Sequence, residues 1–259
     1  MGILEGKKGL IFGVANERSI AWHIAQHAVE QGAECGFSFL PGEKMEARVR
    51  KTLSRGGMEG AWTFPCDVSS DEDLDRLFGA VKAHFGSLDF VVHSIAYADR
   101  DYLKPGTFAA TPRSVFSQAL DISAYTLIAI AGRAAPLMPD GGSILALSYY
   151  GAEKAAAGYN VMGVAKSALE STSRYLAAEL GEQGIRVNCL SAGPCRTLSA
   201  MAVGGIDVIL KKVESAAPLR RNIETAEVGK AAAYLLSDLS SGVTGETHHV
   251  DAGYNAIVT

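Results

Sequence analysis

The apolar run GLIFGV, residues 9–14, is the stretch that decides the fold of this chain. It has the composition of a buried strand, and after a polar loop Ile20 to Gln31 shows the periodicity of an amphipathic helix. Cys35 to Leu40 is again apolar and is stopped by Pro41-Gly42, so we interpret it as a second strand. A strand, a helix and a strand in this order predict a parallel βαβ unit.

The same alternation continues along the chain. Further helices are expected at Glu43 to Arg55, Asp71 to Phe85, 113–138 and 155–180, and further strands at Ala61 to Phe64, Leu88 to His93, Ser143 to Leu147, Arg186 to Leu190 and His248 to Val250. Strands that are apolar on both faces and alternate with helices form a parallel sheet covered on both sides. The sequence therefore predicts an α/β fold, a doubly wound Rossmann sheet of about seven strands, in a single domain over residues 1–259.

The composition is that of a globular protein with a substantial core. Of 259 residues, 48% are hydrophobic and 20% are charged, and no linker or internal repeat divides them. The net charge of -4 argues against nucleic acid or an anionic membrane surface as a partner. The four cysteines include no Cys-x-x-Cys pair, which favours free thiols in a reducing compartment. We therefore expect neither a disulfide framework nor a metal site.

No segment of the sequence is expected to target the chain to a membrane. The apolar run near the N-terminus ends at Asn16-Glu17 and is too short for a signal peptide. The best apolar stretch, Leu127 to Met138, is interrupted by Arg133 and falls short of membrane-spanning length. We therefore expect a cytoplasmic protein with no membrane partner.

The run YNVMGVAK, residues 159–166, is the main candidate for chemistry because it places a phenol and an ammonium seven residues apart. In a long helix over 155–180 the two side chains share a face, roughly 10 Å apart along the axis. A neighbouring cation lowers the pKa of a phenol, so the pair is a candidate proton donor. Taken alone, the spacing favours a simpler interpretation, a surface Tyr and a surface Lys that share a face.

Residues at the ends of three predicted strands are candidates for binding a dinucleotide. Gly13 follows the first strand, where backbone N–H groups and a helix N-terminus receive a pyrophosphate in such folds. Ser19 either caps that helix or binds a phosphate, and Asp67 either accepts from an adenine amino group or caps the next helix. The tetrapeptide HSIA, residues 93–96, offers small residues for close approach of a cofactor, and its histidine is interpreted as structural.

Four motifs carry a resemblance to a known family: GVANERSIA (13–21), HSIA (93–96), SYYGAE (148–153) and YNVMGVAK (159–166). On these motifs nearly the whole chain resembles the short-chain dehydrogenase/reductase superfamily and, more narrowly, its enoyl-[acyl-carrier-protein] reductase branch. Most members of the superfamily have Tyr-x3-Lys and a serine upstream of the Tyr. This chain has Tyr-x6-Lys, Ala146 in place of that serine, and a second tyrosine, Tyr149, that matches the enoyl reductases.

The resemblance implies a specific reaction: reduction of the C2=C3 double bond of trans-2-enoyl thioesters on acyl carrier protein, with hydride from NADH, as the last reductive step of fatty-acid elongation. It makes Tyr159, Lys166 and Tyr149 the catalytic residues, with Tyr159 stabilising the enolate and Lys166 holding the nicotinamide ribose. The cofactor-binding residues that it implies are Gly13, Ser19, Ile20, Asp67, Val68, Ser94, Ile95, Lys166 and Thr197. The substrate-binding residues that it implies are Ala96, Tyr97, Tyr149, Met162 and Ala200.

The longer Tyr-to-Lys spacing has a physical interpretation. If Lys166 holds the ribose, three extra residues move the Tyr159 phenol roughly 4.5 Å along the helix. A carbonyl reductase gives its proton to the oxygen on the carbon that takes the hydride. An enoyl thioester instead takes hydride at C3, while negative charge gathers on the oxygen at C1. We therefore hypothesise that the displaced phenol suits an enoyl substrate.

The cofactor preference depends on the end of the second strand. NAD-binding Rossmann proteins usually carry Asp or Glu there, and binders of the extra phosphate often carry Arg. Leu40-Pro41-Gly42 offers neither, and Glu43 and Lys44 follow. We expect NADH because no Arg adjoins the strand end, and we leave NADPH open.

The resemblance also implies a flap and a docking surface. The segment 198–206, with Gly204-Gly205, resembles the mobile flap over the substrate. The basic cluster of the family is expected at 204–208, which is nearly uncharged here. Four basic residues that follow it either meet the carrier protein or form a solvated face: Lys211, Lys212, Arg220 and Arg221.

Assembly and alternative activities complete the expectations. The resemblance implies a homotetramer packed through the helix that carries Tyr159, with the apolar end Tyr254 to Val258 buried in it or within the subunit. A carbonyl or hydroxyl dehydrogenase on the same fold is one alternative activity. Ala146 counts against it. A cofactor-binding protein without catalysis is the other, and the presence of both tyrosines with Lys166 counts against that.

Overall fold

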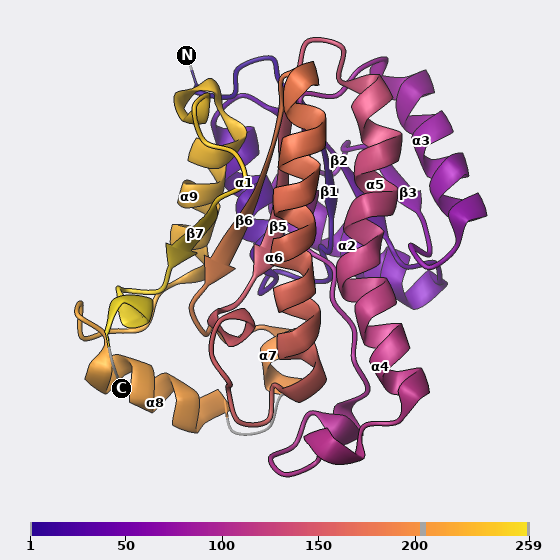
Figure 1. Ribbon diagram of the computed structural model, residues 1–259. Helices are drawn as coiled ribbons and strands as arrows, with labels where there is room; N and C mark the ends of the chain where they lie inside the picture. Colours follow the sequence, from indigo (N-terminus) through magenta and orange to yellow (C-terminus); the bar gives the residue numbers. More distant parts are fainter. Residues whose placement is uncertain (1, 203–205, 258–259) are drawn as a thin grey trace.

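One sheet of seven parallel strands runs through the molecule. The computed structural model describes residues 2–202 and 206–257 (Figure 1). The strands lie in the order β3-β2-β1-β4-β5-β6-β7. They are β1 Lys8–Phe12, β2 Glu34–Phe39, β3 Thr63–Pro65, β4 Phe90–His93, β5 Gly142–Ser148, β6 Ile185–Ala192 and β7 Thr247–Val250. The predicted doubly wound α/β sheet is confirmed, and its strand order reverses between β1 and β4.

Helices cover both faces of the sheet. They are α1 Ile20–Glu30, α2 Glu43–Arg55, α3 Asp71–Phe85, α4 Arg113–Leu120, α5 Thr126–Ala134, α6 Asn160–Leu180, α7 Leu198–Ala202, α8 Ile206–Ala216 and α9 Thr225–Leu236. Successive strand residues point to opposite sides. Ile11 therefore joins the core under α1, α2 and α9, while Leu10 and Phe12 join the core under α3, α5 and α6. Figure 1 shows α5 and α6 on the face of the sheet turned to the viewer.

The two edge strands of the sheet are short. β3 has three residues and ends at Pro65, and β7 has four residues. The longest strands, β5 and β6, lie in the interior and pair from Gly142 to Ser148. The long strands therefore have a hydrogen-bonded neighbour on each side.

The helix predicted at 113–138 is present, with an irregular turn in its middle. α4 continues through a π-helical turn, Asp121–Tyr125, into α5 and a 3₁₀ turn, Ala135–Leu137. The combined helix Arg113–Leu137 is long and apolar enough to cross a membrane by length and composition, which the sequence reading of 127–138 did not foresee. A core helix of a globular protein passes the same test, and 44% of this apolar window is buried inside the fold.

The long helix α6 starts later than predicted. Its first residue is Asn160, so the expectation of a helix from residue 155 is wrong. The cause is the backbone, because Gly158 has φ +81° and Asn160 has φ +46°, both in the left-handed region. Tyr159 therefore precedes the regular turns of α6. The rise along a helix does not give its distance from Lys166, and the 4.5 Å displacement expected from helical geometry does not apply.

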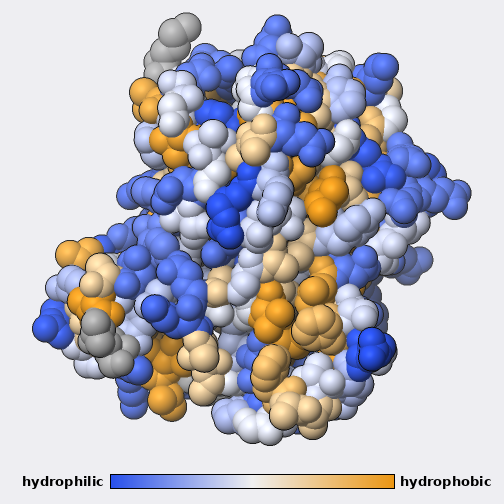
Figure 2. Space-filling model, in the orientation of Figure 1, coloured by the Kyte–Doolittle hydropathy of each residue, from blue (hydrophilic) through white to orange (hydrophobic). Residues whose placement is uncertain are grey.

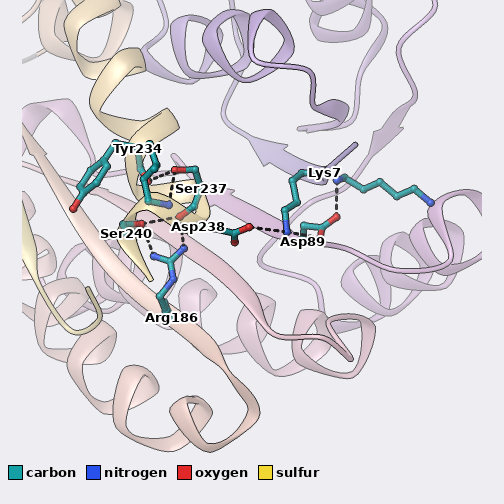
Figure 3. A network of polar contacts seen from close by, with 9 residues as sticks. Lys7, Asp89, Arg186, Tyr234, Ser237, Asp238 and Ser240 are labelled. Atoms are coloured by element: carbon teal, nitrogen blue, oxygen red, sulfur yellow. Dashed lines mark hydrogen bonds and ion pairs between the residues drawn. The ribbon is translucent and has the colours of Figure 1, made fainter. Parts of the chain in front are cut away.

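Arg186 holds the amino-terminal end of the sheet against the end of α9 (Figure 3). Its guanidinium donates to the carbonyls of Leu235 and Ser237, at 3.0 and 3.1 Å. It also donates to the Ser240 hydroxyl, at 2.8 Å. The last carbonyls of a helix have no partner within the helix. At the end of α9 they accept from Arg186 and also from the hydroxyls of Ser143 and Ser240.

Lys7 extends this contact to β1 and β4, as Figure 3 also shows. Its ammonium lies 3.5 Å from Asp89, just before β4, and 3.6 Å from Asp238, just after α9. Asp89 also accepts from the backbone N–H of Lys8 at 2.8 Å. The amino-terminal edge of the sheet is thus closed by charged groups, on the side opposite the carboxyl ends of the strands.

Replacing Arg186 with Met should lower the free energy of unfolding by about 2–3 kcal/mol, because charge-assisted hydrogen bonds to carbonyls are lost. Urea denaturation measures the change. The matched control is Arg50→Met, which breaks only the exposed pair with Glu46 and should cost less than about 1 kcal/mol. Equal costs for the two variants would show that the Arg186 contacts do not stabilise the fold.

Candidate functional site

A cavity of about 580 Å³ opens at the carboxyl ends of β1, β4, β5 and β6. This is the edge at which doubly wound sheets bind their ligands, next to the point where the strand order reverses. Most residues predicted for cofactor, substrate or catalysis line it: Gly13, Ser19, Ile20, Ser94, Ile95, Ala96, Tyr97, Tyr149, Tyr159, Met162, Lys166, Thr197 and Ala200. The volume is typical of a site for a small molecule or cofactor.

Gly13 forms the tightest contact of the cavity floor. Its φ is +97°, and a Cβ at this position would lie 2.0 Å from the Ser94 carbonyl oxygen. Only glycine permits both the left-handed backbone and this approach. The end of β1 can therefore lie directly against the end of β4.

Ser19 does not cap α1, although it occupies the N-cap position. Its hydroxyl accepts from the N–H groups of Ala15 and Asn16, both at 3.1 Å. The hydroxyl thus shapes the loop between β1 and α1, and no described side chain caps the first turn of the helix. An uncapped helix N-terminus in a Gly-containing loop is suited to a phosphate.

Asp67 and Val68 are not among the residues that line the cavity. Asp67 accepts from the N–H and the hydroxyl of Ser69, at 3.0 and 2.7 Å. The cap of α3 is Ser70, which accepts from the N–H of Asp73. The alternative that Asp67 caps this helix is therefore wrong, and an adenine contact remains a prediction.

His93 is a buried structural residue, as its position in the sequence suggested. Its side chain has no exposed surface, and Nε2 lies 2.8 Å from the Thr126 hydroxyl. Burial lowers the pKa of His93 to about 3, with a smaller contribution from the charge of Lys166. A histidine that stays neutral and is enclosed by protein is no general base.

Lys166 lies buried beneath the cavity. Its side chain is 5% exposed, and Nζ donates to the Leu147 carbonyl at 2.5 Å. Burial lowers the pKa of this ammonium to about 8, while nearby Cys189 and Glu170 act in the opposite direction. One hydrogen bond anchors the ammonium to β5, and the others that it can form are available to a ligand.

The Tyr159 and Tyr149 rings pack against each other in the wall of the cavity. Their ring centroids are 4.8 Å apart, with the planes at 70°. Burial raises the pKa of the Tyr159 phenol far above its usual range, and Tyr149 and Glu170 raise it further. The expectation that Lys166 lowers the pKa of this phenol is wrong, because desolvation dominates. Tyr159 is a neutral hydrogen-bond donor at physiological pH.

A sequence profile for one family, described as "Enoyl-(Acyl carrier protein) reductase", matches residues 13–255 of this chain. The chain belongs to the enoyl-(acyl carrier protein) reductase family. Its second tyrosine and its Tyr-x6-Lys spacing are the features by which the sequence alone pointed to this branch.

Individual members of the enoyl-(acyl carrier protein) reductase family match over almost their whole length. "Enoyl-[acyl-carrier-protein] reductase [NADH] 1" of Rhizobium meliloti is 50% identical, over 99% of this chain and 93% of the relative. The Bacillus cereus reductase, solved with NADP+ and indole naphthyridinone, superposes with a TM-score of 0.96 at 47% identity and covers 100% of both chains. The Anaplasma phagocytophilum reductase, solved with NAD, has a TM-score of 0.94 at 48% identity and covers 100% of this chain and 97% of its own.

Two glycines of this reductase bring Tyr159 close to its neighbours. A Cβ at Gly151 would lie 2.6 Å from the Tyr159 ring, and a Cβ at Gly163 would lie 2.8 Å from the Gly151 carbonyl oxygen. The turn Tyr150–Ala152 therefore packs against α6 without side chains between them. The sequence showed SYYGAE as a motif, but the contact that requires its glycine is tertiary.

Glu170 and Ser123 are polar residues that the sequence analysis missed, and each hydrogen-bonds to a residue that lines the cavity. Glu170 is 7% exposed and accepts from the Ser148 hydroxyl at 2.5 Å. Its position one turn after Lys166 is a signal that the sequence does contain. Ser123 accepts from the N–H of Tyr97 at 3.0 Å, and it lies on the π-helical turn, which no sequence pattern indicated.

The predicted flap and docking residues are only partly described. α7 and the start of α8 belong to segment 198–206, whereas Gly204-Gly205 lie outside the described residues. Arg221 forms a two-point ion pair with Glu227, and Lys211 and Lys212 are exposed on α8. The charge of Arg221 is thus already used within the chain.

Replacing Gly151 with Ala should destabilise the fold by about 1–3 kcal/mol, because the added methyl forces the Tyr159 ring to move. Gly79→Ala is the matched control. It lies on the exposed side of α3 with nothing within 4 Å of its Cβ, and should stabilise by about 0.5–1 kcal/mol. Thermal unfolding of both variants measures the difference. A harmless Gly151→Ala would mean that this contact is not tight.

The low pKa of Lys166 makes stability depend on pH. Between pH 8 and 10.5 the unfolded chain holds a proton on Lys166 that the folded chain has released, so the free energy of unfolding contains a term that rises with pH. The stability of the native chain relative to Lys166→Met should therefore increase by up to about 3 kcal/mol across this window. Urea denaturation at several pH values measures it. A difference that stays flat or falls with pH would contradict the burial argument.

Proposed function

We propose that residues 1–259 act as one reductase domain that reduces the C2=C3 double bond of trans-2-enoyl thioesters on acyl carrier protein, with NADH, in the last reductive step of fatty-acid elongation. The observation that carries this proposal is a neutral Tyr159 phenol, packed against Tyr149, in one cavity with Lys166. Membership of the enoyl-(acyl carrier protein) reductase family supports the same substrate class.

The cavity has features that fit a dinucleotide. The close approach at Gly13 and the uncapped start of α1 suit a pyrophosphate, and the buried Lys166 ammonium suits ribose hydroxyls. Ser94, Ile95 and Thr197 line the same cavity. When bound, the reduced nicotinamide supplies the hydride. Asp67 and Val68 would contact the adenine from outside the cavity.

Tyr159 stabilises the negative charge that builds on the thioester oxygen when C3 takes the hydride. A buried neutral phenol is suited to this role because its hydrogen bond acts in a medium of low dielectric. The Lys166 charge favours the same anion. Tyr149, whose pKa is also raised by burial, assists at the carbonyl. The acyl chain lies along Ala96, Tyr97, Met162 and Ala200, which line the same cavity.

The cofactor that we propose is NADH. Leu40 directly follows β2 and is 56% exposed, and the acidic Glu43 begins α2 three residues further on. No Arg adjoins the strand end to pair with an added 2′-phosphate, and a carboxylate near that end disfavours one. Family members have been solved with NAD and with NADP+. A direct comparison of NADH and NADPH as donors decides the preference.

The assembly that we propose is a homotetramer in the cytoplasm. Large apolar side chains are exposed on the helices of one face: Phe116 on α4, Tyr125 on the π-helical turn, Ile128 on α5 and Tyr175 on α6. Figure 2 shows apolar surface in this region of the molecule. Contact between copies would cover it. The four cysteines are free and buried, which suits a reducing compartment.

Oxidation of NADH at 340 nm with crotonyl or 2-dodecenoyl thioester tests the reaction, run beside acetoacetyl thioester. Turnover of the enoyl substrates alone is expected, and Tyr159→Phe should lower kcat by about 10²–10³-fold, the usual cost of losing an oxyanion donor. Tyr150→Phe is the matched control, since it removes a neighbouring hydroxyl that does not line the cavity.

Other outcomes would assign the chain a different function. Turnover of the keto substrate alone would make it a carbonyl reductase and remove the role proposed for Tyr159. Binding of NADH without turnover of either substrate would indicate a protein that binds the cofactor without catalysis.

A further inference from the structure

Asn160 occupies a strained position between Tyr159 and the regular turns of α6. Its φ of +46° is in the left-handed region, which few residues other than glycine adopt. Among residue types with a side chain, Asn tolerates this region best. The carbonyl of Tyr159 accepts from the N–H of Met162 at 3.0 Å, so the first turn closes around Asn160. This backbone conformation sets the direction in which Tyr159, the residue before it, is oriented relative to α6.

The side chain of Asn160 contacts a segment far away in the sequence. Its amide nitrogen lies 2.7 Å from the Tyr102 carbonyl oxygen, 2.8 Å from the Lys104 carbonyl oxygen and 3.0 Å from the Thr107 hydroxyl. Two amide hydrogens are thus shared among three acceptors, all in residues 100–107, which we call the cavity loop. Thr107 also donates to Lys104 at 2.8 Å, which holds the acceptors together.

The cavity loop is a wall of the site. Arg100 and Leu103 line the cavity, and Leu103 is 5% exposed. Leu103 packs in a small apolar cluster with Val161 and Met162 of α6, and Tyr159 packs against the same cluster. The Asn160 amide therefore joins the cavity loop to the start of α6, next to Met162, along which the acyl chain is proposed to lie.

We propose that Asn160 is a positioning residue for the enoyl reduction: its left-handed backbone and its amide bonds to the cavity loop together hold the Tyr159 hydroxyl where the thioester oxygen is bound. The inference rests on the proposed function. It replaces helical rise as the reason why the longer spacing suits an enoyl substrate. The reactive tyrosine is placed by a tethered left-handed residue.

Three variants separate the two contributions of Asn160. Asn160→Gly keeps the left-handed backbone without strain but removes the tether. Asn160→Asp keeps the shape of the side chain but turns a donor into an acceptor that faces two carbonyls. Thr107→Val removes one acceptor of three. With dodecenoyl thioester, kcat should fall about 10-fold for Asn160→Gly and about 10²-fold for Asn160→Asp, and less than about 3-fold for Thr107→Val.

A double-mutant cycle with Tyr159→Phe tests whether Asn160 acts through the tyrosine. Once the hydroxyl is absent, Asn160→Asp should lower kcat by less than about 2-fold, because no donor remains to be positioned. Hydrogen exchange of the amides of residues 102–107 should accelerate in both Asn160 variants and remain unchanged in Tyr159→Phe. Ala252→Gly, at another left-handed residue, should leave kcat unchanged.

The outcomes for Asn160 and for the enoyl reductase activity are distinguishable. If native enzyme reduces enoyl thioesters and the two substitutions lower kcat independently, Asn160 does not position Tyr159 and the inference fails while the function stands. Unchanged hydrogen exchange in the Asn160 variants would also overturn it, even for a folded and active protein. Absence of enoyl turnover by native enzyme would overturn the proposed function itself, and with it the role given to Asn160.

Discussion

The bond from the buried Lys166 ammonium to the Leu147 carbonyl is the interaction on which the geometry of the site depends. It joins α6 to the carboxyl end of β5. One helical turn further along α6, Glu170 accepts a hydrogen bond from Ser148. Two consecutive strand residues are thus held by two residues on one face of a helix. Tyr149 follows this contact directly, and its ring packs against that of Tyr159, which immediately precedes α6. The relative position of the tyrosines is therefore set from both sides.

Burial determines the protonation of this site more than attraction between its charges does. For the Tyr159 phenol and the Lys166 ammonium alike, loss of hydration is the largest cause of the pKa shift, and it acts against the charged form of each. A phenol that resists ionisation remains a donor at the pH at which the substrate is reduced. The same low dielectric strengthens the hydrogen bond that it donates. Burial of the pair thus keeps the proton on the phenol and also strengthens the hydrogen bond that the phenol donates to an anion.

Much of this architecture can be predicted from the sequence because apolar strands between glycines and prolines have few alternative structures. The site residues follow, since the ends of parallel strands meet at one edge. The start of α6 was missed because an Ala-rich run favours helix, whereas Gly158 and Asn160 adopt left-handed backbone beside the cavity loop. The π-helical turn and the raised pKa of Tyr159 depend on tertiary contact and desolvation. Neither leaves a periodic trace in the sequence.

The short edge strands affect how readily the chain pairs with other chains while it folds. An open strand edge is a template for pairing with another chain, and parallel sheets form slowly because their contacts are distant in sequence. Here β3 offers three residues and ends in a proline without an N–H, and β7 offers only four. The longer strands become accessible only if the centre of the sheet opens. Once assembled, the sheet presents little for amyloid-like growth at either end.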